Sequence, residues 1–259
     1  MQIISQPQDL PQDGCAFVPT MGALHAGHCS LIKKAAEYDL PVVVSVFINP
    51  EQFAPNEDFH NYPKNLAKDV ELASEHGADI VFAPTNEIVY PHKLKDIVLP
   101  PVATMPRLED AFRPTHFQGV CKVVSRLFDL VQPIKAIFGE KDYQQLLVIK
   151  AMAEKTGRWK NLEIIGSPIV RSQEGLALSS RNCFLSQQQR KIAHCLHKAI
   201  ACDTEEAMLK LLKNQNLTID YAVIRNANDL LQPNKHQKNR ALVAVKIGNI
   251  RLIDNGEIA

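Results

Sequence analysis

Short apolar runs alternate with amphipathic segments through the first two-thirds of the chain. The run 42–48 is rich in β-branched residues and predicts a buried parallel strand, and shorter apolar runs predict strands at 15–18, 80–82 and 136–138. Strands that alternate with helices predict an α/β fold, with a Rossmann-like, doubly wound parallel sheet covered by helices on both faces. The two apolar stripes that predict these helices are Leu31, Ile32, Ala35 and Ala36, and Val120, Val123, Val124, Leu127 and Val131.

The pattern changes near Pro168. Helical stretches at 187–201 and 205–213 come first, and short strands at 221–224, 241–246 and 250–253 follow, with a polar loop at 232–237. Helices followed by strands predict a smaller α+β domain. We therefore expect a Rossmann-like domain at 1–168, which binds nucleotide and substrate, and a smaller C-terminal lid domain at 169–259.

Composition narrows the class of protein. The 259 residues are enough for a large core, and a formal net charge of +1 argues against a polyanion-binding surface, so nucleic acid is not an expected partner. The longest apolar run is far too short to span a bilayer, and the N-terminus lacks the pattern of a secretory signal. The six scattered cysteines, without a Cys-x-x-Cys pair, predict buried reduced thiols and a cytoplasmic protein.

The sheet predicts where a site lies. Ligands of doubly wound folds bind beyond the carboxyl ends of the strands. Thr20, Asn49 and Gly139 each follow a predicted strand end. We therefore expect three segments that are distant in the sequence to meet at one edge of the sheet.

Residues 17–28 carry the strongest chemical pattern. An apolar run leads into a small-residue turn, and His25 and His28 then stand three apart at a predicted helix start. Glycine lets the backbone approach a ligand closely, and the free N–H groups of a helix N-terminus favour phosphate. Both histidines would point into one site. The alternatives are a turn with two ordinary surface histidines, and zinc binding, for which no third ligand stands nearby.

Two later segments also suit phosphates. Lys141 lies in Gly-Glu-Lys-Asp just after a predicted strand and can reach a phosphate as a point charge. Ser179, Ser180 and Arg181 offer hydroxyl groups and a guanidinium beside a turn. Taken alone, the first segment is as well explained by a capped surface turn, in which Asp142 is the cap, and the second by an N-cap cluster.

Longer strings connect these segments to a known family. His-x-Gly-His resembles the HIGH signature of adenylate-forming nucleotidyltransferases, and Pro-Thr-Met-Gly-Ala-Leu-His-x-Gly-His is similar to the pantothenate synthetase family. Gly-Glu-Lys-Asp-Tyr-Gln-Gln and Gly-Leu-Ala-Leu-Ser-Ser-Arg-Asn resemble its ATP-binding segment and its counterpart of the KMSKS loop. Asn61-Tyr62-Pro63 and the 113–120 loop also match, although Leu178 replaces a usual methionine and Thr115 a usual glycine. The resemblance covers about 18 to 254.

The resemblance implies an ATP-dependent ligase that joins pantoate to β-alanine through a pantoyl adenylate and releases AMP and pyrophosphate. It implies ATP and Mg²⁺ as cofactors and a homodimer as the assembly. The alternatives are a nucleotidyltransferase of the same fold acting on another small substrate, and a nucleotide-binding module without activity.

The resemblance also assigns roles to residues of this chain. His28, His25, Lys141 and Arg181 are the expected catalytic residues, with His28 as proton donor, and Gln52 and Gln145 are expected to hold pantoate and β-alanine. Asp69 is expected to assist Mg²⁺, with a solvated helix carboxylate as the alternative. The residues expected to bind ATP are Met21, Gly22, Ala23, Leu24, His25, Ala26, Gly27, His28, Gly139, Glu140, Lys141, Asp142, Val170, Leu178, Ser179, Ser180 and Arg181.

Overall fold

The computed structural model describes residues 1–53, 62–215 and 217–258, and Asn61 of the matched string therefore lies outside the described residues. In these ranges, six parallel strands form one sheet in the order β1-β4-β3-β2-β5-β6. This order confirms the predicted doubly wound parallel sheet. The strands are β1 (Gln2–Ile4), β2 (Ala16–Thr20), β3 (Val42–Val46), β4 (Ile80–Phe82), β5 (Lys135–Gly139) and β6 (Glu163–Ser167).

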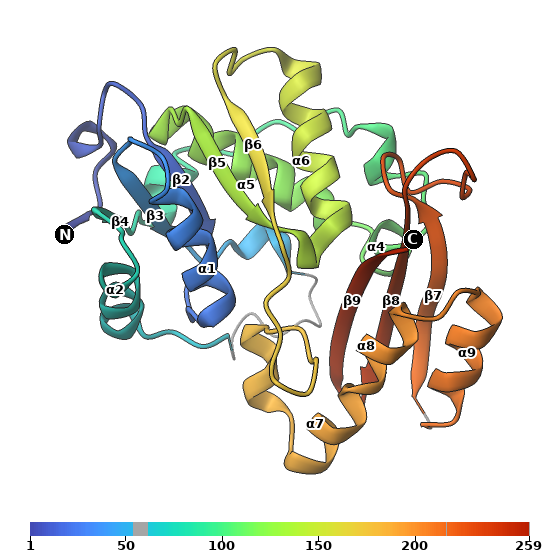
Figure 1. The fold of residues 1–259 in the computed structure, drawn as a ribbon. Helices are drawn as coiled ribbons and strands as arrows, with labels where there is room; N and C mark the ends of the chain where they lie inside the picture. The colour runs from blue at the N-terminus through green and yellow to red at the C-terminus, as the bar shows by residue number, and fades with distance from the viewer. Residues whose placement is uncertain (54–61, 216, 259) are drawn as a thin grey trace.

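Helices cover both faces of this sheet (Figure 1). Their bounds are α1 (Ala26–Ala35), α2 (Leu66–Glu75), α3 (Asn86–Val89), α4 (Glu109–Phe112), α5 (His116–Val131) and α6 (Tyr143–Thr156). Short 3-10 turns lie in the connections at η1 (Pro7–Asp9), η2 (Pro50–Gln52), η4 (Pro101–Ala103) and η5 (Glu140–Asp142).

Alternation along the strands explains the two covered faces. Phe17 and Val43 pack into the core beneath α5 and α6, whereas their neighbours Val18 and Val44 pack into the core beneath α1 and α2. Successive side chains of a strand point to opposite faces, so continuous apolar runs are expected where both faces are buried. The predicted stripe of α1 is confirmed at Leu31, Ile32 and Ala35, but Ala36 is exposed and caps the helix.

The C-terminal part is an α+β unit, as predicted. In the described residues, three antiparallel strands form a second sheet in the order β7-β8-β9 (Figure 1). The predicted helix at 187–201 is divided at His194 into two helices. The elements are η6 (Ser180–Phe184), α7 (Gln187–Ala193), α8 (Cys195–Ile200), α9 (Glu205–Lys213), β7 (Thr218–Asn226), β8 (Asn239–Ile247) and β9 (Ile250–Ile258).

A buried ionic cluster joins the second sheet to α4. Both terminal nitrogens of Arg251 in β9 donate to the carboxylate of Glu109, over 2.8 and 2.7 Å, and the Tyr221 hydroxyl donates to the same carboxylate over 2.7 Å. Burial raises the pKa of Glu109, but the Arg251 charge and these hydrogen bonds outweigh it and hold that pKa below its usual range. Moving the second sheet away from α4 would leave a buried charge without its partner, which is costly. The cluster therefore holds the second sheet against the first half of the chain.

The cysteines follow the prediction in part. All six are free thiols, and four are buried. Cys183, in η6, is exposed, however, and Cys202, which follows α8, is half-buried. Among the described residues, no helix combines the length and the apolar character that crossing a bilayer requires.

Candidate active site

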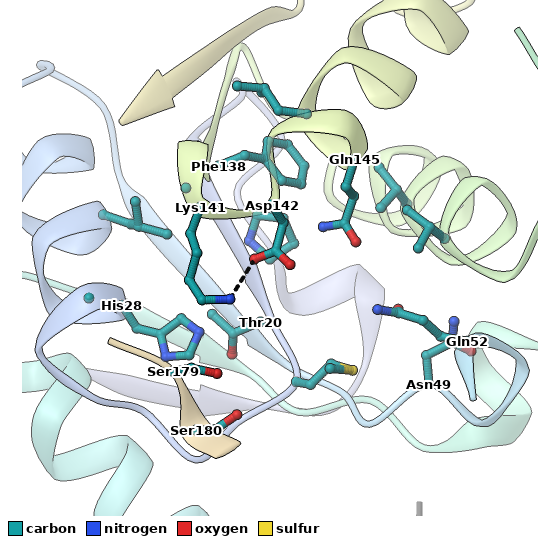
Figure 2. Close-up of a pocket in the computed structure, with 18 of the residues that line it drawn as sticks. Thr20, His28, Asn49, Gln52, Phe138, Lys141, Asp142, Gln145, Ser179 and Ser180 are labelled. Atoms are coloured by element: carbon teal, nitrogen blue, oxygen red, sulfur yellow. Dashed lines mark ion pairs between the residues drawn. The ribbon is translucent and has the colours of Figure 1, made fainter. Parts of the chain in front are cut away.

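The predicted segments meet in one pocket beyond the carboxyl ends of β2, β3 and β5. Its lining comes from the stretches 19–31, 47–53, 113–127, 138–146, 168–170 and 178–181, and from Tyr62. Figure 2 shows His28, Lys141, Ser179 and Ser180 around one end of the pocket, and Asn49, Gln52 and Gln145 around the other. The parallel sheet gathers them, because all its strands end at the same edge.

A tight turn connects β2 to α1 and shapes the first end. The Thr20 hydroxyl donates to the Ser45 carbonyl over 2.7 Å and accepts from the Gly22 N–H over 3.1 Å. Gly22 and Ala23 both have positive φ, +79° and +51°. Ala23 takes up this strained conformation because its N–H and that of Leu24 are held by the Asp69 carboxylate, over 3.0 and 2.7 Å. The turn thereby delivers His25 to the start of α1.

His25 and His28 lie against each other, as predicted. Their ring centroids are 4.1 Å apart, and His25 caps α1 by accepting the Gly27 N–H on Nδ1 over 3.1 Å. That bond makes Nε2 the protonated nitrogen of a neutral His25 ring. Nδ1 of His28 is buried without a hydrogen-bond partner among the described residues.

Both imidazoles are neutral at pH 7. Burial, followed by the neighbouring His25 and Lys141 charges, lowers the pKa of His28 to about 3, and burial with Lys141 lowers that of His25 to about 4. Each ring therefore offers an uncharged N–H to a ligand and adds no positive charge to the site. In the described residues, no three His, Cys, Asp or Glu side chains are grouped so that they could together hold a metal ion.

This burial predicts a pH dependence of stability. Unfolded histidine titrates near pH 6.5, so the unfolded chain binds protons more readily than the folded chain below that pH. We expect the free energy of unfolding in urea to fall as the pH drops from about 6.5 toward 4, and the His25→Ala/His28→Ala variant to fall less steeply. The exposed His236→Ala variant is the control. Identical slopes in all three proteins would contradict this prediction.

Lys141 supplies a cation to the same end. It lies in η5, directly after β5, and its ammonium is 3.8 Å from the Asp142 carboxylate (Figure 2, dashed line). The side chain is 19% exposed and lines the same pocket as both histidines. Lys141 can therefore meet phosphate oxygens beside His25 and His28.

The segment that contains Ser179 and Ser180, here called the serine segment, closes the same end of the pocket. The Leu178 N–H donates to the Val170 carbonyl over 2.9 Å, so the two residues lie side by side in the lining. Ser179 caps η6 by accepting the Arg181 N–H over 3.3 Å, and the Ser180 hydroxyl lies 3.1 Å from that of Tyr62. The N-cap alternative is thus correct for Ser179, and the same residue also lines the pocket.

The opposite end is built around Asn49, a side chain that is 1% exposed. Its amide donates to the Gly119 carbonyl over 3.1 Å, and its Oδ1 accepts from the Tyr90 hydroxyl over 2.7 Å and from the Glu51 N–H over 3.2 Å. A Cβ on Gly119 would lie 2.1 Å from the Glu51 carbonyl oxygen, so this glycine lets α5 pack directly on η2. Gln52, which follows in η2, is held at the pocket by this packing.

Comparison with known proteins agrees with this geometry. The family profile described as Pantoate-beta-alanine ligase matches residues 2–257. Curated relatives include the pantothenate synthetases of Clostridium botulinum, 44% identical over 92% of this chain and 89% of theirs, and of Thermus thermophilus, 43% identical over 96% and 95%. The chain belongs to the pantoate-beta-alanine ligase family.

Solved structures of family members have the same fold. The crystal structure of the pantothenate synthetase from Thermus thermophilus superposes with a TM-score of 0.92 at 41% identity and covers 98% of both chains. A pantoate-beta-alanine ligase from Francisella tularensis, complexed with beta-gamma ATP and beta-alanine, gives a TM-score of 0.84 at 33% identity, over 99% and 97%. The predicted ATP-dependent ligase is thus confirmed as a family assignment, and the alternative nucleotidyltransferase is not supported.

Most of the predicted site residues line the pocket of this ligase. Gly22, Ala23, Leu24, Ala26 and Glu140 do not. Gly22, Ala23 and Leu24 shape the turn before His25, Ala26 begins α1, and Glu140 points toward Arg240, 3.4 Å away. The residues brought together as predicted are Met21, His25, Gly27, His28, Gln52, Gly139, Lys141, Asp142, Gln145, Val170, Leu178, Ser179, Ser180 and Arg181.

The prediction for Asp69 requires correction. A solvated carboxylate is wrong, because the residue is 3% exposed. The magnesium role also lacks support, since Asp69 does not line the pocket and each of its oxygens accepts a backbone N–H of the turn. The geometry instead makes Asp69 the residue that holds the β2–α1 turn in place.

We expect Asp69→Asn to lower the free energy of unfolding by about 1–3 kcal/mol, because an amide replaces one of two buried acceptor oxygens. We also expect kcat to fall, while the Mg²⁺ concentration needed for half-maximal activity stays the same. Asp79→Asn is a matched control, since Asp79 accepts the Val42 N–H over 2.8 Å away from the pocket. A higher Mg²⁺ requirement at unchanged stability would restore the magnesium role.

Some pocket residues received no role from the sequence. Tyr62, Arg113 and His116 all line the pocket, and Nδ1 of His116 lies 3.3 Å from the Gln52 carbonyl. The matched strings that contain them were the available signal. Their function depends on contacts between distant parts of the chain, such as Tyr62 to Ser180, which local patterns do not carry.

Proposed function

We propose that this ligase condenses pantoate with β-alanine in the pocket described above, by way of a pantoyl adenylate. The observation that carries the proposal is the meeting of His28, Lys141 and the serine segment at one end of a pocket whose other end holds Gln52 and Gln145. One end offers N–H groups, hydroxyls and cations for phosphates, and the other offers amides for a hydroxy acid. ATP and pantoate thus have separate places that meet in the middle.

In the first step, a carboxylate oxygen of pantoate attacks the α-phosphorus of ATP, and pyrophosphate leaves. The protein contributes by placing the two anions in line and by stabilising the charge that develops on the phosphates. We assign this charge stabilisation to Lys141 and Arg181, with hydrogen bonds from Ser179, Ser180 and the neutral imidazoles of His25 and His28. We assign the adenine ring of ATP to the side chain of Leu178 and the backbone of Val170.

In the second step, the amine nitrogen of β-alanine attacks the carbonyl carbon of the adenylate. The carbon–oxygen bond to the phosphate breaks, AMP leaves, and the nitrogen gives up a proton. Gln52 and Gln145 hold the pantoyl group during this attack, and their neutral amides orient the substrate without adding charge. Closure of the C-terminal region, which we take as a lid at 169–259, keeps water from the adenylate.

Magnesium fits this pocket as a companion of the nucleotide. Mg²⁺ usually keeps several waters and binds through substrate phosphates with one or two carboxylates. Among the described lining residues, Asp142 is the carboxylate, and it stands next to Lys141. We assign Asp142 to the ion, which neutralises phosphate charge when bound. The homodimer and the cytoplasmic location stay predictions from the resemblance and the composition.

A product assay tests the proposed function. We expect ATP, pantoate and β-alanine to yield equal amounts of AMP and pantothenate, and pantoate alone to support exchange of labelled pyrophosphate into ATP. A dinucleotide product, or ATP binding without any AMP, would refute the proposal in favour of a nucleotidyltransferase or an inactive binding module.

A further inference from the structure

Asn255 is a buried residue of β9 that reaches the phosphate-binding segment from the second sheet. Its amide nitrogen donates to the carbonyl of Glu140 over 3.0 Å and to that of Lys141 over 2.8 Å. The residue is 3% exposed and does not line the pocket. Both amide protons are therefore used on the backbone of η5, and the contact reaches the site only through this backbone.

The orientation of this amide is fixed by its surroundings. Oδ1 of Asn255 accepts from a terminal nitrogen of Arg240, whose guanidinium also lies 3.4 Å from the Glu140 carboxylate and 3.8 Å from the centre of the Tyr143 ring. A flipped amide would place oxygen against two carbonyl oxygens and nitrogen against a guanidinium. Only a side chain with a donor and an acceptor in this order satisfies all three partners.

The backbone of Asn255 is held as firmly. Its N–H donates to the Asp254 carboxylate over 2.8 Å, and its carbonyl accepts from Arg171 over 3.2 Å. Arg171 itself binds both oxygens of Asp254, over 2.6 and 2.9 Å, and donates to the Gly175 carbonyl over 3.0 Å. Arg171 and Gly175 belong to the chain segment that leads to Ser179. Asn255 thus stands between the segment of Lys141 and the segment of the serines.

The segment that carries Lys141 needs such support. Gly139, at the start of η5, provides no side-chain cap, and Asp142, at the end of η5, makes no cap bond at the start of α6. The Asn255 amide ties down the two peptide carbonyls at this junction. A shift of the junction would move the Lys141 ammonium relative to the phosphates, and a misplacement of about 1 Å can cost on the order of 100-fold in rate.

We propose that Asn255 is a positioning residue for Lys141, and that its amide holds η5 so that the ammonium faces the pocket. The proposal rests on the role proposed above for Lys141. The second sheet then contributes to catalysis, because the correct placement of the Lys141 ammonium depends on a residue of β9.

The test compares Asn255→Asp and Asn255→Ala, each alone and combined with Lys141→Met. We expect each single variant to lower kcat on the order of 100-fold with an unchanged KM for β-alanine. The combined variants should have the kcat of Lys141→Met alone, because a residue that acts only through Lys141 has nothing left to position. Asn226→Asp is the matched control: Asn226 is a 5% exposed asparagine of β7 whose amide bonds to Gln237, away from the pocket.

Several outcomes would overturn the proposal. The first three are a normal kcat in both Asn255 variants, a loss of kcat that multiplies with that of Lys141→Met, and an equal loss of kcat in Asn226→Asp. The fourth is loss of folded structure in both Asn255 variants by circular dichroism, which would make the residue purely structural. A normal kcat in Lys141→Met would instead refute the role of Lys141, and the present proposal with it, so the two failures are told apart by that single variant.

Discussion

Replacing Lys141 by methionine is expected to lower kcat by about 100- to 1000-fold, the cost of removing one preorganised donor from developing charge. The Lys141 ammonium stands among His25, His28 and Asp142 at the end of the pocket assigned to the phosphates. Methionine keeps an unbranched apolar stem of similar length, so the variant loses the charge and retains most of the packing. Steady-state kinetics with saturating ATP, pantoate and β-alanine measure the effect.

Lys135→Met is the matched control for this variant. Lys135 begins the strand β5 that Lys141 follows, its side chain is similarly covered at 22% exposed, and it pairs with Glu163. It lies at the end of the strand away from the pocket, so we expect an unchanged kcat. Equal activity of the two variants would show that the charge of Lys141 does not act on the reaction.

Replacing His28 by alanine is expected to lower kcat by a similar factor. The ring is buried and neutral, its centroid lies 4.1 Å from that of His25, and it lines the phosphate end of the pocket. A neutral N–H fixed in a water-poor site stabilises developing charge without reorganising, which makes its removal costly. His28→Gln keeps an N–H donor and should recover part of the loss.

His76→Ala controls for the removal of an imidazole from a helix. His76 follows α2 and its Nδ1 bonds to the Leu72 carbonyl over 2.7 Å, outside the pocket. We expect this variant to keep its kcat. If His28→Ala were as active as His76→Ala, with both proteins folded, the assigned role of His28 would be refuted.

The central strands were predictable from the sequence because burial on both faces produces continuous apolar runs, and α5 was predictable because its apolar residues recur at helical spacing. The edge strands β1 and β6 were not predicted. β1 is three residues long, and the middle of β6 is half-buried, so neither produces a long apolar run. The meeting of residues 20, 49 and 139 at one edge followed from the topology alone, since parallel strands end together.

The side-chain contacts that build the site were less predictable. The sequence identified His25, His28, Lys141 and the serines, whose types and spacing are read locally. It misjudged Asp69, because the partners of this carboxylate lie 45 and 46 positions away. Asn255 left no sequence signal for the same reason, since it acts on a backbone 114 and 115 positions distant.

Transfer of oxygen-18 from the carboxylate of pantoate tests the central claim most directly. If the carboxylate attacks the α-phosphorus between the two ends of this pocket, one labelled oxygen must stay on phosphorus when the amine displaces AMP. Mass spectrometry of the products should therefore find one oxygen-18 in AMP and none in pyrophosphate. Unlabelled AMP, or label in pyrophosphate or in free phosphate, would contradict the account.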